Sequence, residues 1–150
     1  MRISVQDAPF DLGAETAAFA QAQNSMGAIV TFTGVVRDTP DHALDVMEIE
    51  HYPGMTEKAI SSIAEQAIKR FGLGDALIIH RHGRLVPGEV IMMVATAARH
   101  RKNAFDGAEF LMDYLKSRAP FWKREVGHDG ANWVEARDED EDALSRWSKS

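Results

Sequence analysis

The feature that most constrains the fold is the apolar run V-I-M-M-V-A-T-A-A at residues 90–98. A strand with one face in water alternates apolar and polar residues, whereas this run is apolar on both faces. That pattern is typical of a central strand covered on both sides. A membrane-spanning helix needs about 20 apolar residues, so the run is too short to be one. The sequence therefore predicts a sheet with packing layers on both faces.

Other segments have the composition of strands. Residues 28–37 are rich in β-branched and aromatic side chains, and Gly34 among them indicates a bulge or a close backbone approach. Residues 44–52 alternate apolar and polar, as a half-buried strand does. Residues 76–85 form a further strand, joined to the central run by V-P-G-E as a tight hairpin. F-W-K-R-E-V and W-V-E-A-R, which flank H-D-G-A-N, predict a second hairpin.

Helical patterns separate these strands. Residues 14–23 are alanine-rich without a breaker, and Thr56 is a good N-cap for a second helix that ends at Gly72. Asn103 can cap a third helix, and the acid-rich D-E-D-E-D-A-L-S-R-W predicts a short terminal helix or a frayed tail.

Hairpins mixed with helices predict an α+β fold in a single domain, residues 1–150. We expect a mixed, largely antiparallel sheet with about three helices packed on it, plus a small, hammerhead-like β-hairpin subdomain.

Charge and composition exclude several classes of protein. The formal net charge is −6, whereas general nucleic-acid binding usually needs a basic face. Without cysteine the chain has no disulfide, no thiolate metal site and no cysteine nucleophile. Motifs of phosphate loops, dinucleotide sites, serine hydrolases and zinc proteases are missing from the sequence. The N-terminus lacks a signal-peptide pattern, so we expect a cytoplasmic protein that binds neither nucleic acid nor membrane.

Positive charge nevertheless gathers in Y-L-K-S-R-A-P-F-W-K-R-E, at Lys116, Arg118, Lys123 and Arg124. Pro120 has no N–H and disfavours helical geometry in the residue before it, so a helix should end near Arg118 and a strand should follow. Lys116 and Lys123 would then lie on two elements that can face one pocket. The alternative is that the first two cations are ordinary helix-end charges, which the helix dipole stabilises.

A second basic cluster, A-A-R-H-R-K-N at residues 97–103, lies between the central strand and a helix N-terminus. Such junctions often hold anions, so the cluster could cradle a phosphate or could be a solvated loop. His80 and His82 would project from one strand face as two metal ligands, but no third ligand has convincing spacing, so we predict no metal. His51 is expected to be a hydrogen-bonded structural histidine.

Several stretches together resemble the catalytic (large) subunit of molybdopterin synthase over nearly the whole chain. They are V-T-F-T-G-V-V-R, E-H-Y-P-G-M-T-E-K-A, I-I-H-R-H-G-R-L-V-P-G-E, H-R-K-N-A-F, M-D-Y-L-K-S-R-A-P-F-W-K-R-E and W-V-E-A-R. The resemblance implies a sulfurtransferase that converts cyclic pyranopterin monophosphate to molybdopterin by inserting two sulfurs. The sulfur would come from the C-terminal thiocarboxylate of a small ubiquitin-like subunit with a Gly-Gly tail. Dimerisation of the large subunits would give a heterotetramer, with no cofactor.

The resemblance also implies roles for single residues. Lys116 matches a key catalytic lysine and Lys123 a second one, and both would contact the substrate. The other residues that match substrate-binding positions are Val35, Val36, Arg37, His100, Arg101, Arg124 and Glu125. Residues expected to line the pocket are Phe32 and Met112, either of which could be plain core, and Arg137, which could be donated across the dimer.

Two rival functions use the same residues. A non-catalytic module that binds a phosphorylated small molecule or an acidic protein tail needs the basic pocket but no reactive lysine. A purely structural oligomer subunit would place Phe121 and Trp122 in its interface.

Overall fold

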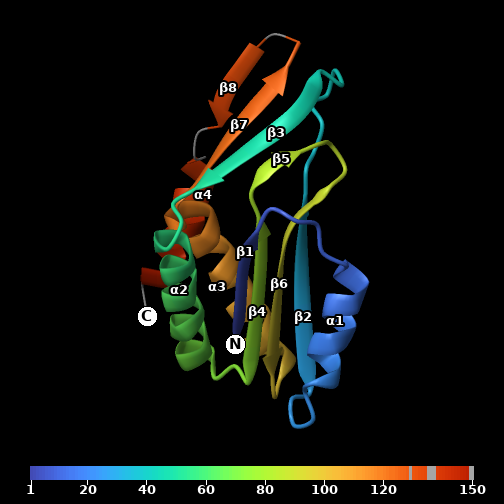
Figure 1. Cartoon of the computed structure of the whole chain (residues 1–150). Coiled ribbons are helices and arrows are strands. Elements are labelled where there is room, and N and C mark those ends of the chain that lie inside the picture. The colour runs from blue at the N-terminus through green and yellow to red at the C-terminus, as the bar shows by residue number, and fades with distance from the viewer. Residues whose placement is uncertain (129, 135–137, 149–150) are drawn as a thin grey trace.

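The structure is a computed structural model that describes residues 1–128, 130–134 and 138–148. These residues form two four-stranded sheets, four α-helices and a short 3₁₀ helix (Figure 1). The strands are β1 (Arg2–Gln6), β2 (Ala28–Val35), β3 (Leu44–His51), β4 (Asp75–Arg81), β5 (Gly83–Leu85), β6 (Val90–Ala98), β7 (Phe121–Gly127) and β8 (Gly130–Val134). The helices are α1 (Leu12–Gln21), α2 (Met55–Phe71), α3 (Arg101–Arg118), α4 (Asp138–Ser145) and the 3₁₀ helix η1 (Arg146–Ser148). The α+β prediction is confirmed.

The first sheet has the strand order β1-β4-β6-β2, and only the β1–β4 pair is parallel. As predicted, β6 is central and both of its faces are covered. Met92 and Val94 pack in the core beneath α2 and α3, whereas Met93 and Ala95 pack on the other face with Phe19 of α1. In Figure 1, α1 accordingly lies on the opposite side of this sheet from α2 and α3.

The second sheet has the order β5-β3-β7-β8 and forms an arm that extends beyond the helices in Figure 1. The prediction of one strand over 76–85 is wrong, because the chain leaves the first sheet after Arg81 and joins the second at Gly83. Gly83 has a φ of 94°, which glycine adopts without steric cost, and this allows the sharp change of direction. The hairpin of β7 and β8 is confirmed, while β1 had no predicted counterpart.

Helix ends show where local signals succeed. Pro120 acts as predicted, since α3 ends at Arg118 and Ala119 is extended with a ψ of 136°. Gly72 ends α2 in the left-handed region with a φ of 63°. The bulge expected at Gly34 is also present, as a register shift between Gly34 and Val35.

Helix starts were predicted less well. The first helix begins two residues earlier than expected, at Leu12, because the Asp11 carboxylate accepts a 2.9 Å bond from the Ala14 N–H. Thr56 is not an N-cap, because its buried hydroxyl donates to the Tyr52 carbonyl. Asn103 does not cap α3, since its amide donates to the Phe71 carbonyl instead and the helix starts at Arg101.

Within the described ranges, no helix is both long and apolar enough to cross a bilayer.

Candidate functional site

The last turn of α3 and the strand β7 bring two lysines together. Lys116 is exposed near the helix end, and Lys123 is half-buried on the face of β7 that also carries Phe121 and Glu125. Lys123 pairs across the strands with the buried Ile49 of β3. The aliphatic part of the Lys123 side chain therefore begins at an apolar surface. The ends of the two side chains are close enough for their charges to repel. The break at Pro120 is what puts them on separate elements.

The environment of Lys123 lowers the pKa of its amine. Burial is the main cause that lowers the pKa of Lys123 below its usual range, and repulsion from Lys116 lowers this pKa further. Asp140 of α4 acts in the opposite direction and raises the pKa of Lys123. A lysine that loses its proton more readily than usual can act as a base or a nucleophile near neutral pH.

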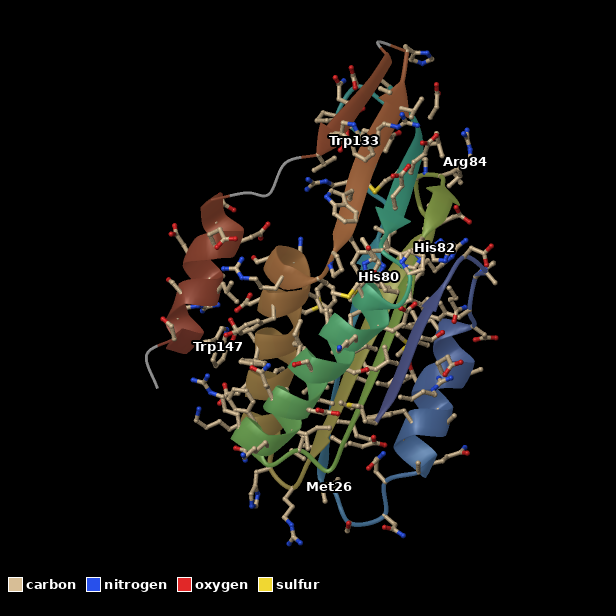
Figure 2. The ribbon with its side chains drawn as sticks, turned by 60° about the vertical axis from the view of Figure 1, so that its left-hand side comes forward. Met26, His80, His82, Arg84, Trp133 and Trp147 are labelled. Atoms are coloured by element: carbon tan, nitrogen blue, oxygen red, sulfur yellow. The ribbon has the colours of Figure 1, made fainter. Side chains whose placement is uncertain are left out.

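Aromatic rings lie beneath Lys123. The His80 ring is buried and stacks on Phe121, with centroids 3.8 Å apart and planes inclined by 16°. Behind this stack, the His51 and His82 rings are 4.4 Å apart. Figure 2 shows His80 and His82 at the junction between the first sheet and the arm. The sequence contained the His-Arg-His spacing, but no local signal could reveal that its first imidazole stacks on a phenylalanine far along the chain.

Burial keeps His80 neutral. It lowers the pKa of His80 to about 4, and the nearby charge of Lys123 lowers this pKa too, although the contact with the Arg81 backbone opposes the shift. The Nδ1 atom of His80 lies 2.7 Å from the Arg81 carbonyl oxygen, which can only accept, so Nδ1 carries the proton. Burial also lowers the pKa of His51, whose Nδ1 lies 3.1 Å from the Thr56 hydroxyl. No group of three or more metal-ligating side chains occurs among the described residues.

Arg124 is directed away from the two lysines. It lies on the opposite face of β7, where it forms an ion pair with Glu48 and its guanidinium carbon lies 5.5 Å from the Trp133 ring centroid. Glu48 also pairs with Arg84 at 3.0 Å. The structure thus places Glu125, but not Arg124, on the Lys123 face.

The end of β2 carries the predicted substrate-binding strand. Phe32 and Val35 are exposed along this sheet edge, Val36 is buried, and Arg37 is exposed just beyond the strand. Val36 is fixed by two backbone bonds, in which its N–H donates to Glu89 at 2.9 Å and its carbonyl accepts from Gly88 at 2.8 Å. Since β2 pairs with the start of β6, Arg37 lies at the same end of the first sheet as the last turn of α3.

His100 and Arg101 lie at the other end of α3 from Lys116. This helix has 18 residues, which at 1.5 Å per residue is a length of about 27 Å. One copy of the chain therefore does not bring this pair together with Lys116 and Lys123. Met112 lies one turn before Lys116 and packs partly against the core, and Arg137 is outside the described residues.

The pair begins a helix with free N–H groups. His100 is the N-cap residue with extended geometry, and it makes no side-chain capping bond. The first turn contains no acidic residue, so the dipole of α3 meets the cation of Arg101, whereas Lys102 pairs with Asp106 at 2.9 Å. Cations are unfavourable at this end of a helix, and a bound anion would reverse that effect. The geometry therefore suits the phosphate site predicted here.

Known proteins are similar to this chain along almost its whole length. A family model described as "MoaE protein" matches residues 5–118. The molybdopterin synthase catalytic subunit of Cereibacter sphaeroides is 65% identical over 147 residues, which cover 98% of this chain and 100% of that protein. The solved structure of the molybdopterin biosynthesis MoaE protein from Burkholderia ambifaria has a TM-score of 0.84 at 50% identity, over 99% of both chains.

A more distant structure shares the fold alone. It is the protein–protein complex of subunits 1 and 2 of the molybdopterin-converting factor from Helicobacter pylori, with a TM-score of 0.77 at 20% identity. The match covers 90% of this chain and 91% of that one.

Proposed function

Because this chain belongs to the MoaE family, we propose that it is the catalytic subunit of a molybdopterin synthase. In this reaction, cyclic pyranopterin monophosphate becomes molybdopterin as two sulfurs are inserted, one from each of two thiocarboxylated copies of a small partner subunit, whose C-termini are left as carboxylates. The observation that carries the proposal is the pair of Lys116 and Lys123, with the second amine desolvated. A sulfur-inserting enzyme without cysteine must receive its sulfur from elsewhere, and an anionic sulfur donor suits a cationic pocket.

Each part of the site has a separate role in this proposal. Lys116, the exposed member of the pair, lies beside the incoming thiocarboxylate and either transfers a proton or stabilises charge as sulfur attacks the pterin. Lys123 holds the thiocarboxylate or tunes Lys116. Arg37, His100 and Arg101 bind the anionic substrate, most strongly at its phosphate.

The complete site requires two partners. A small ubiquitin-like subunit, whose Gly-Gly tail reaches Lys116, supplies sulfur in the cytoplasm. Because about 22–24 Å of helix separates His100 and Arg101 from Lys116, a second copy of the chain would supply the phosphate-binding pair. The assembly is then a heterotetramer built on a dimer of this chain.

The test mixes the chain with thiocarboxylated small subunit and cyclic pyranopterin monophosphate, and measures the two-sulfur product by mass. We expect Lys116→Ala and Lys123→Ala each to lower the rate by about 100-fold or more, as the loss of an acid–base or electrostatic group does. Lys69→Ala is the matched control, because Lys69 is also a lysine in the last turn of a helix and should leave the rate unchanged. Complex formation without product in the wild type would instead favour a non-catalytic binding module.

A further inference from the structure

We propose that His80 and Phe121 are positioning residues that hold Lys123 against Lys116. This inference rests on the proposed function, because it concerns the same pair of lysines. It assigns a role to the buried His80, for which the His-Arg-His spacing had suggested only metal binding.

The first step is the geometry of β7. Phe121 is the first residue of the strand, directly after Pro120, and it lies on the same face as Lys123. The position of the Phe121 ring therefore determines where the strand leaves the helix and where its next inward side chain points. The stack with His80, at 3.8 Å between centroids, fixes that ring to β4 of the first sheet.

The second step is the rigidity of the imidazole. His80 is 6% exposed, and its Nδ1–H donates to the carbonyl of Arg81. Arg81 is itself 6% exposed, and its guanidinium donates twice to the Asp7 carbonyl, at 3.1 and 2.9 Å. The ring beneath Phe121 is thus anchored through β4 and through Asp7, which directly follows β1, so the arm that carries Lys123 cannot shift without breaking the stack.

The third step is the charge around the stack. Lys123 meets Lys116 from α3 and Asp140 from α4, while His80 meets Lys123 together with His51 and His82. Glu57 of α2 lies near His51 and favours its protonation. Since His80 stays neutral, the stack lies near Lys123 without adding a third positive charge to the two lysines.

The test measures the pKa of Lys123 directly, by NMR titration of the chain with ¹³C-labelled lysine, alongside turnover with thiocarboxylated partner. We expect His80→Ala, which opens the stack, to raise the pKa of Lys123 toward its ordinary value and to lower kcat by about 10-fold, with little change in KM. His80→Phe keeps an aromatic ring on Phe121 and should restore most of both quantities. His128→Asn, at an exposed histidine, is the control and should match the wild type.

A merely structural role gives a different result. If His80→Ala lowers the unfolding temperature but leaves the pKa of Lys123 and kcat unchanged, the inference is overturned. Should that variant not fold, Phe121→Leu opens the same stack from the other side and is judged by the same two measurements. The NMR titration needs no turnover, so a chain with no synthase activity would refute the proposed function while the positioning of Lys123 is still measured.

Discussion

His80 is a buried base, and its cost to folding depends on pH. In the unfolded chain its pKa is near 6.5, whereas burial lowers it to about 4 in the fold. Above pH 6.5 the ring is neutral in both states and contributes no pH dependence. Between pH 6.5 and 4 only the unfolded chain binds the proton, so the free energy of unfolding falls as the pH falls.

The expected size of this loss follows from the shift. At 1.36 kcal/mol per pKa unit, the wild type should lose about 3 kcal/mol of stability from His80 alone between pH 7 and pH 4. His80→Phe removes the titrating group, so chemical denaturation at several pH values should show a flatter curve for this variant. His128→Asn should keep the wild-type curve. Parallel curves for the wild type and His80→Phe would contradict a buried, neutral imidazole.

Among the helices, α3 carries the largest number of candidate site residues. Close packing against the core holds this helix in place. A Cβ atom added at Gly107 would lie 2.9 Å from both Cδ atoms of Leu73, which is itself buried in the core. Glycine within a helix costs up to about 1 kcal/mol relative to alanine, yet here its missing side chain allows Leu73 to pack against the backbone of α3. Steric overlap should outweigh propensity at this position.

We therefore expect Gly107→Ala to destabilise the chain by about 1–3 kcal/mol, since an overpacked core shifts side chains from their preferred rotamers. Gly13→Ala is the contrasting variant, because its nearest neighbour, the Asp11 carboxylate, lies 3.5 Å from the added Cβ. Because Gly13 is exposed, this substitution should leave the stability of the chain unchanged or raise it slightly. Denaturant midpoints of the two variants check the expectation, and equal midpoints would show that Leu73 yields to the new methyl group.

For the whole molecule, the length of α3 has the largest consequence. The helix carries cationic residues at each end, about 22–24 Å apart, so under the proposed function one chain would contain two half-sites. In a symmetric dimer, each complete site would combine Lys116 and Lys123 of one copy with His100 and Arg101 of the other.

Subunit mixing tests this arrangement. Lys116→Ala and Arg101→Ala should each abolish most activity as pure dimers. After the two are mixed and allowed to exchange, roughly a quarter of the wild-type rate should return, because half of the dimers are mixed and each has one intact site. Activity is measured by product mass with thiocarboxylated partner. No recovery after proven exchange would mean that each site draws all its cations from one copy.

The sequence alone determined what depends on neighbouring residues. The apolar run 90–98 required a sheet covered on both faces, and Pro120 required a helix end between the two lysines because a missing N–H acts within a few residues. The motifs between residues 30 and 137 also carried the resemblance to the family. These features set the fold class and the central pair of the site.

Only the tertiary structure decided which distant residues meet. Thr56 and Asn103 have the chemistry of helix caps, but their side chains bond to Tyr52 and Phe71, which a local pattern does not reveal. The stack of His80 on Phe121 likewise depends on how the arm docks on the first sheet. The separation of Lys116 from His100 follows from the straight length of a helix, so spacing along the chain does not measure proximity in a site.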